Sequence, residues 1–186
     1  KNGVEWFRGS ENNVLLRFCK IIQKKKPDIV IRITSDCPLI DSKIIRKGLK
    51  ILLKNFNGID YLSNTLERTY PRGLDFEIFK SKCLLESLSN RKNLVDLEHV
   101  TPFIYNNPNK FIIKQLKDKE DNSKLRLTVD TQEDFDLIKK ILEYFKKKES
   151  LYTFNYKDIL KLLKKNPNWL KINSHIKQKG IFFEKI

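Results

Sequence analysis

Hydrophobic residues follow two patterns along this chain: short runs of β-branched residues, and longer stretches with helical spacing. The clearest short run extends from Ile29 to Thr34, with Arg32 as its polar interruption. Pro27 precedes it, and Ser35-Asp36-Cys37-Pro38 ends it abruptly. A nearly continuous run of this kind is typical of a strand that is buried in a parallel sheet. The sequence therefore predicts a central strand here.

Helical spacing and short apolar runs alternate over the rest of the chain. Helices are expected over residues 10–25, 42–55, 81–89 and 132–148, at the end of 96–105, and in a short stretch from 155. Further strands are expected over residues 4–7, 60–64, 74–79, 111–116 and 125–129. Ser10, Asp41, and either Thr131 or Asp130 are the expected helix caps. The alternation predicts an α/β fold with right-handed crossovers and a mostly parallel sheet.

Two acidic residues directly follow predicted strands and precede predicted helices. They are Asp36, after the central strand, and Asp130, after the strand expected at 125–129. Because ligands of open α/β sheets bind just beyond the carboxyl ends of the strands, these two acids can meet at one site. Carboxylates there suit a divalent cation that also binds phosphate oxygens. For Asp36 the alternative is a purely structural role as a turn cap, and the residues leave both roles open.

Composition narrows the class of protein. The chain has 186 residues, of which 40% are hydrophobic and 33% are charged, as in an ordinary soluble globular protein. The formal net charge is +15, but the excess is mostly lysine at surface-like helix positions, and no basic block is interleaved with aromatic residues. We therefore expect no specific nucleic-acid partner, although the charge can attract an anionic small molecule.

The three cysteines are odd in number and scattered, without a CxxC pair, so neither a disulfide framework nor a zinc site is expected. Free thiols fit a reducing cytoplasm. No apolar run approaches the roughly 18 residues of a membrane span, and no signal-peptide pattern is present. We expect a cytoplasmic protein without a membrane span. Residues 1–165 are expected to form the α/β domain, and the apolar tail of residues 166–186 to pack on it or on a second subunit in a homodimer.

Six short motifs occur in order along the chain. They are residues 7–15 (FRGSENNVL), 32–41 (RITSDCPLID), 61–65 (YLSNT), 70–75 (YPRGLD), 98–102 (EHVTP) and 126–134 (RLTVDTQED). Together they resemble the cytidylyltransferases of the spore-coat polysaccharide type, which are relatives of the synthetases that make CMP-activated KDO and sialic acid. The resemblance covers nearly the whole chain, including the closing stretch 173–178 (NSHIKQ).

The resemblance implies a three-layer α/β/α fold like that of nucleotide-diphosphosugar transferases. It also implies that a sugar hydroxyl attacks the α-phosphate of CTP with the help of Mg²⁺, giving a CMP-sugar and pyrophosphate for cell-surface polysaccharide biosynthesis. By similarity, Asp36 and Asp130 would hold the metal and so serve catalysis. The residues expected at the nucleotide are Arg8, Gly9, Ser10 and Thr34. Those expected at the sugar are Asn64, Arg68, Tyr70, Arg72, Asp75, Glu77, Glu98 and His99.

Two of these assignments carry alternatives. His99 could act as a general base because its ordinary pKa lies near neutrality, but sugar binding is the preferred role. As an isolated pair, Glu98 and His99 could equally be surface or structural residues. Thr34 stands where the sugar-acid synthetases have a glutamine near the cytosine, which leaves recognition of the base open.

The chain departs from the family pattern at its start. The family opens with a strand and a Gly/Ser/Arg/Lys-containing loop that cradles the CTP phosphates, and Lys1 lies after that unit. We therefore expect an N-terminally truncated fold that lacks the first strand-loop-helix unit and is weak or inactive alone, with an active full-length parent. The alternatives are a GT-A-like glycosyltransferase using a nucleotide-sugar donor, which Asp36-Cys37-Pro38 disfavours, and a non-catalytic homologue.

Overall fold

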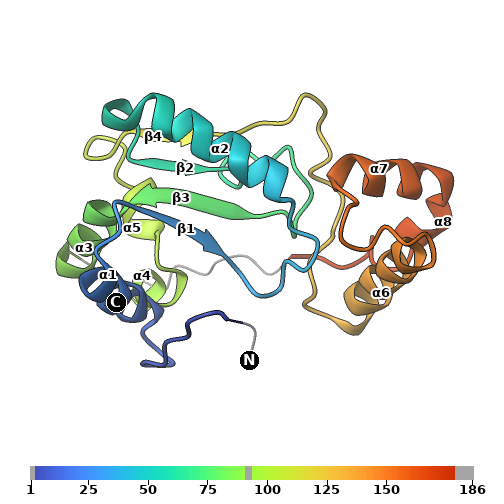
Figure 1. Ribbon diagram of the computed structural model, residues 1–186, viewed down its shortest axis with the longest axis horizontal. Coiled ribbons are helices and arrows are strands. Elements are labelled where there is room, and N and C mark those ends of the chain that lie inside the picture. The colour runs from blue at the N-terminus through green and yellow to red at the C-terminus, as the bar shows by residue number, and fades with distance from the viewer. Residues whose placement is uncertain (1–2, 91–93, 179–186) are drawn as a thin grey trace.

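The computed structural model describes residues 3–90 and 94–178, and in these residues the sheet has four strands. They are β1 (Ile29–Ile33), β2 (Tyr61–Ser63), β3 (Phe76–Lys80) and β4 (Ile113–Gln115), in the spatial order β1-β3-β2-β4. Strand β3 is antiparallel to both of its neighbours, whereas β2 and β4 are parallel. Three strands thus share one direction, and β3 is inserted between β1 and β2 against it (Figure 1).

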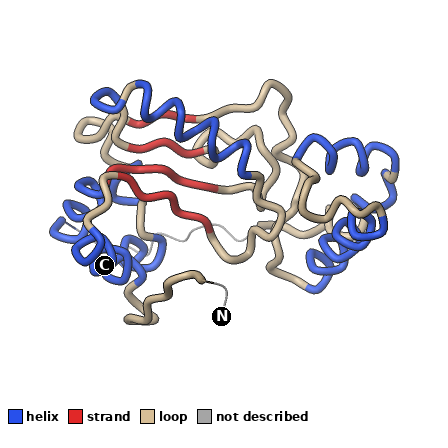
Figure 2. Tube along the Cα trace, viewed as in Figure 1, coloured by secondary structure: helices blue, strands red, loops and turns tan. Residues whose placement is uncertain are grey.

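Helices cover both faces of this sheet or lie beyond its end. They are α1 (Val14–Lys25), α2 (Ser42–Lys54), α3 (Ser81–Asn90), α4 (Leu94–His99), α5 (Pro102–Tyr105), α6 (Gln132–Lys147), α7 (Tyr156–Lys165) and α8 (Pro167–Leu170), with a short 3-10 turn at Phe56–Gly58. Helices α6, α7 and α8 form a group beyond the end of the sheet to which β1 points (Figures 1 and 2). Each helix in the described residues is too short or too polar to cross a membrane.

Two clusters of buried apolar side chains, one on each face of the sheet, hold the helices against the sheet and so form the three layers. Leu62 of β2 lies opposite Ile78 of β3, and both pack in the cluster that contains the buried side of α2. Tyr61 and Phe79 lie opposite each other on the other face, in the cluster built by α1, α3 and α5. At Gly48 of α2 an added Cβ would lie 2.9 Å from the Phe76 ring, so the helix packs closely on the sheet. The predicted three-layer α/β/α fold is confirmed. The sheet is mixed, however, since two of the three pairings in the described residues are antiparallel. Strand β1, predicted as a central strand in a parallel sheet, lies at the sheet edge and, among these residues, pairs with β3 alone.

Capping explains where most of the long helices begin. Asp41 caps α2 by accepting the N–H of Lys43, and Thr131 caps α6 in a capping box, as does Asn155 at α7. The first helix begins later than predicted. Its cap is Asn13, and the Ser10 hydroxyl instead accepts the N–H of that residue.

Two predicted strands are wrong. Residues 4–7 form no strand, and the side chains of Val4 and Trp6 are both 78% exposed. An apolar run of four residues does not distinguish a strand from coil when no sheet edge pairs with it. Residues 125–129 also form no strand. Their backbone is joined to Arg72 by a single bridge and to Asp36 by a hydrogen bond from Val129.

The apolar part of the tail packs on the rest of this chain. Trp169, Leu170 and Ile172 lie against the same cluster that contains the buried faces of α6 and α7. Residues 179–186, including the predicted tail residues Phe182 and Phe183, lie outside the described residues. The domain boundary at residue 165 and the homodimer stay predictions.

Gly73 allows the Pro-x-Gly turn to dock on residues 125–128. Its φ is +95°, and an added Cβ would lie 2.3 Å from the carbonyl carbon of Leu127. We predict that Gly73→Ala lowers the free energy of unfolding by at least about 2 kcal/mol, because the methyl group adds strain and a backbone clash. Urea denaturation measures this change.

The matched control is Gly3→Ala, since Gly3 also has a positive φ but an added Cβ there meets nothing within 4 Å. That change is expected to cost about 1 kcal/mol or less. Equal, small losses at both positions would contradict the close docking of the turn.

Candidate active site

A cleft of about 260 Å³ opens where β1 and β2 end and β3 begins. Seven of the residues predicted from the sequence line it: Thr34, Asp36, Arg68, Arg72, Asp75, Glu77 and His99. Five lining residues were not predicted: Arg32, Thr65, Phe76, Thr101 and Tyr105. The signal for Arg32 was present in the sequence, as a charged residue inside a β-branched run. The structure therefore brings most of the predicted sugar site together with one predicted metal ligand.

The remaining predicted residues lie elsewhere. Residues 8–10 are in the exposed N-terminal segment, where the guanidinium of Arg8 lies over the Trp6 ring at 5.2 Å. Glu98 is exposed on α4. Tyr70 is buried against Tyr156, with 5.7 Å between ring centroids, and lines a different cavity.

Asn64 has a structural environment. It is fully buried, its Nδ2 donates to the carbonyl of Leu74 at 2.7 Å, and its Oδ1 accepts the N–H of Phe76 at 3.1 Å. These two bonds clip the end of β2 to the beginning of β3. Asn64 thus shapes the cleft from behind without lining it.

Asp36 is held from the side of the 125–131 segment. The Thr128 hydroxyl donates to the Asp36 Oδ2 atom at 2.9 Å, and the N–H of Val129 donates to the Asp36 carbonyl at 2.9 Å. Burial raises the pKa of Asp36, but the nearby hydroxyls of Thr34 and Thr128 outweigh it, so the pKa lies below its usual value. The carboxylate is ionised at neutral pH and faces the cleft.

Asp130 follows this segment and is tied to Arg126. The Nη2 atom of Arg126 lies 2.7 Å from the Asp130 Oδ2 atom, and the Asp130 side chain is 40% exposed. Burial lowers the pKa of Arg72, as does the charge of Arg68, while Asp130 and Asp75 act in the opposite direction. Asp130 thus follows the segment that pairs with Arg72, but it is not among the residues that line the cleft.

The donor set of the two acids fits Mg²⁺. Each acid has one carboxylate oxygen available for a metal. Among the described residues, Asp130 uses only its Oδ2 atom, which binds Arg126. The Oδ1 atom of Asp36 has the Cys37 thiol as a distant donor, at 3.7 Å. Hard carboxylate oxygens of this kind, one or two to a site, are what Mg²⁺ takes from proteins when substrate phosphates supply the rest. No cluster of three or more His, Cys, Asp or Glu side chains suited to a metal occurs among residues 3–90 and 94–178.

Glu77 is the centre of a buried network under the cleft. It lies opposite Arg32 in the β1–β3 pairing and forms an ion pair with that residue. It also accepts hydrogen bonds from the hydroxyls of Tyr61, at 2.6 Å, and of Thr101. Its oxygens are thus occupied by protein donors, which favours a role in holding the cleft wall over direct sugar binding.

The cleft contains two further arginines with different environments. Arg68 forms a two-pronged ion pair with Asp75, at 2.6 and 2.8 Å. Within the described residues, Arg72 forms neither an ion pair nor a side-chain hydrogen bond. A guanidinium without a protein partner in a cleft is suited to binding a carboxylate or phosphate group.

A strained turn presents His99 to the cleft. The N–H of Thr101 donates to the carbonyl of His99 at 2.9 Å, which closes a three-residue turn around Val100. Val100 has a φ of +75° and is fully buried, an unfavourable conformation for a β-branched residue. The turn directs Thr101 to Glu77 while His99 lines the cleft. Strain of this kind recurs at functional sites.

The cysteines are not candidates for nucleophiles. Cys19, Cys37 and Cys83 are free and buried, and burial raises the pKa of each thiol to about 11. The thiols are therefore protonated at neutral pH. This agrees with the prediction of free cysteines.

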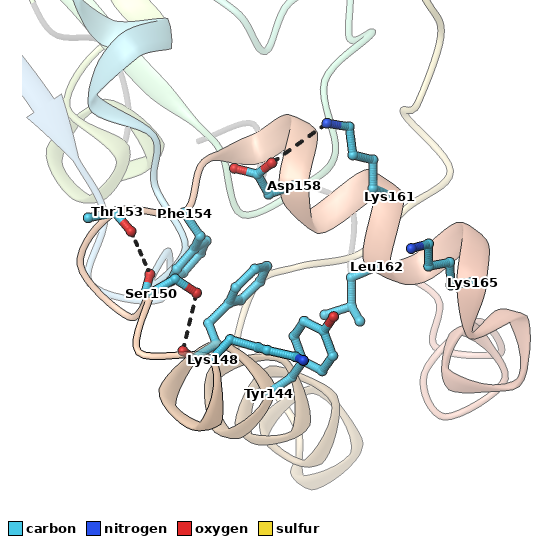
Figure 3. Close-up of a pocket in the computed structure, with 10 residues that line it drawn as sticks. Tyr144, Lys148, Ser150, Thr153, Phe154, Asp158, Lys161, Leu162 and Lys165 are labelled. Carbon is cyan, nitrogen blue, oxygen red and sulfur yellow. Dashed lines mark hydrogen bonds and ion pairs between the residues drawn. The ribbon is translucent and has the colours of Figure 1, made fainter.

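A second hollow lies between α6 and α7 (Figure 3). Its floor contains Phe145 and Phe154, whose rings stack at 4.1 Å, and lysines such as Lys148 and Lys165 border it. Asp158 is its acidic residue, and one of its oxygens accepts the N–H of Asn155 in the cap of α7. None of the predicted site residues lies there, so the cleft at the strand ends is the better candidate for the active site.

Comparison with known proteins gives the family of this chain. The chain belongs to the cytidylyltransferase family, whose sequence model matches residues 2–184. A solved cytidylyltransferase from Leptospira borgpetersenii serovar Hardjo-bovis superimposes with a TM-score of 0.85 and 36% identity, over 96% of this chain and 72% of that one. The resemblance predicted from the six motifs is confirmed.

Two curated relatives extend this similarity. The uncharacterized protein MJ1063 of Methanocaldococcus jannaschii is 37% identical over 180 residues, which is 96% of this chain and 70% of the relative. The spore coat polysaccharide biosynthesis protein SpsF of Bacillus subtilis is 31% identical over 172 residues, 90% of this chain and 68% of the relative.

The Glu77 network yields a stability prediction. We expect Glu77→Gln to lower the free energy of unfolding by about 3 kcal/mol, because it leaves the half-buried Arg32 without its counter-ion. Chemical denaturation measures the loss. The control is Glu5→Gln, whose ion pair with Lys25 is largely exposed and should contribute far less to stability because solvent screens it. Similar losses in the two variants would contradict a buried network.

Proposed function

We propose that this protein transfers CMP from CTP to the hydroxyl of a sugar, giving a CMP-sugar and pyrophosphate. The observation that carries the proposal is the cleft at the strand ends, which gathers residues from four of the six family motifs around Asp36. A fifth motif, residues 126–134, holds Asp36 through Thr128 and Val129. The spore-coat polysaccharide role named for the Bacillus relative supports use of the product in cell-surface polysaccharide biosynthesis. The match to a solved cytidylyltransferase favours this reaction over a glycosyltransferase.

Asp36 and Asp130 are proposed to hold Mg²⁺, which would neutralise phosphate charge and help to orient the displacement. Asp36 contributes an ionised carboxylate that Thr128 keeps in place. Asp130 contributes a partly exposed carboxylate that Arg126 holds.

The other charged residues of the cleft fall into two groups, those whose side chains are already bonded to another side chain in the described part of the chain and those whose side chains are not. Glu77 and Asp75 are paired with Arg32 and Arg68, so they hold the walls. Arg72 is the proposed ligand of an anionic group, either a phosphate of CTP or an acid group of the sugar. His99 is proposed to contact the sugar.

The metal assignment predicts a large catalytic effect. Asp36→Asn and Asp130→Asn should each lower the turnover number for CTP by at least about 100-fold, because each removes a charged metal ligand. Pyrophosphate release at saturating Mg²⁺ measures turnover, and circular dichroism checks the fold. The control is Asp136→Asn, since Asp136 is exposed on α6. Turnover like that of the wild type in both cleft variants would remove the metal assignment.

The unpaired arginine predicts an effect on binding. Arg72→Gln should raise the KM for one anionic substrate by about 10-fold or more, because one charge-assisted hydrogen bond is worth about 1.5–3 kcal/mol. The substrate whose KM rises, CTP or the sugar, is the one that Arg72 contacts. Arg46→Gln on the exposed side of α2 is the control. Unchanged KM values for both substrates would contradict the proposal that Arg72 binds an anionic group.

A further inference from the structure

The closing stretch at residues 173–178 has no role in the chemistry proposed above, yet it contacts the region of Asp130. The Nδ2 atom of Asn173, a residue only 3% exposed, donates to the Arg126 carbonyl at 3.0 Å and to Asp134 at 2.8 Å. The Oε1 atom of Gln178 accepts a hydrogen bond from the Nη1 atom of Arg126 at 2.5 Å. Both ends of the stretch thus converge on one arginine.

The guanidinium of Arg126 is used on all its edges. Nε lies 2.9 Å from one oxygen of Asp134, and Nη2 lies 2.8 Å from the other. Nη2 also donates to Asp130 at 2.7 Å, and Nη1 donates to Gln178. A planar fork with every nitrogen engaged has one orientation, and without Gln178 the Nη1 edge loses its partner while Asp134 and Asp130 hold the other two nitrogens.

Asp134 is the buried acceptor that holds both Arg126 and the backbone around Asp130. It is fully buried, and its Oδ2 atom accepts the N–H of Asp130 at 3.1 Å and of Thr131 at 3.3 Å. Asp130 is therefore held in two ways: Asp134 fixes its backbone, and Arg126 fixes its carboxylate. Packing does not fix that carboxylate, because the side chain is 40% exposed.

We propose that the segment from Asn173 to Gln178 is a positioning element of the active site that sets, through Arg126, the place of the Asp130 carboxylate at the cleft. The inference rests on the proposed function in so far as Asp130 is a metal ligand. Gln178 separates this role from a purely structural one. Its side chain is exposed and its bond to Arg126 is at the protein surface, so its removal should change the orientation of Arg126 while costing little stability.

The test uses Gln178→Ala in the full chain, with Lys177→Ala, an exposed neighbour, as the control. The rescue variant is Gln178→Glu, which keeps an oxygen acceptor for Arg126. Two properties are measured. One is hydrogen exchange of the backbone amides of Asp130 and Thr131, which donate to the same Asp134 oxygen that Arg126 holds. The other is affinity for Mn²⁺ by electron paramagnetic resonance. A melting curve accompanies each variant.

We expect Gln178→Ala to speed exchange at these amides and to weaken Mn²⁺ binding by about 10-fold, as outer-shell changes at metal sites do. The melting temperature should stay within a few degrees, and Gln178→Glu should restore both properties.

Unchanged exchange would overturn the inference. So would faster exchange throughout the chain with a large fall in melting temperature, which would indicate a structural staple. A wild-type chain that binds no Mn²⁺ would contradict the proposed metal site, while the exchange measurement would still decide whether the segment holds the Asp130 turn.

Discussion

The docking of residues 125–131 on two distant turns is the constraint on which the rest of the site depends. The N–H of Arg72 donates to the carbonyl of Leu125, the N–H of Leu127 returns a bond to Arg72, and the N–H of Val129 donates to Asp36. One irregular segment thereby joins the end of β1, the turn before β3 and the start of α6. Gly73 is needed because any larger residue would collide with the backbone of this segment. The result is that the end of β1 and the turn before β3, which are far apart in sequence, line one cleft and are held by the same segment.

Paired charges give this cleft its chemical character. Arg32 and Arg68 have carboxylate partners in Glu77 and Asp75, so their charges hold the walls together. Arg72 has no such partner among the described residues, and its charge is left for an anion. Asp36 is ionised and points into the same space. An unpaired cation beside an ionised acid suits a phosphate group that is bound together with a metal ion.

Patterns between residues close in sequence were sufficient to predict the features that depend on short-range contacts, such as most helix positions and caps. Asp41 was recognised as a helix cap because its side chain satisfies the first turn of its own helix. The insertion of β3 against the direction of its neighbours was not predicted, because strand order depends on contacts between distant segments. The same holds within the site: the motifs indicated Asp36 and Arg72, but nothing in local spacing joined Arg126 to Asp134 and Gln178. Asp134 lies in the first turn of α6, where an acid is common for local reasons, and only the structure shows that it is the buried anchor of that network.

The most direct test of the account is the binding of CTP measured by calorimetry, with and without Mg²⁺, on the wild-type chain and on Asp36→Asn. The account predicts that Mg²⁺ strengthens CTP binding to the wild-type protein and that this gain is lost in the variant, because Asp36 is a ligand of the metal that binds with the nucleotide. CTP binding that is equally strong with and without Mg²⁺, or that Asp36→Asn leaves unchanged, would contradict the central claim.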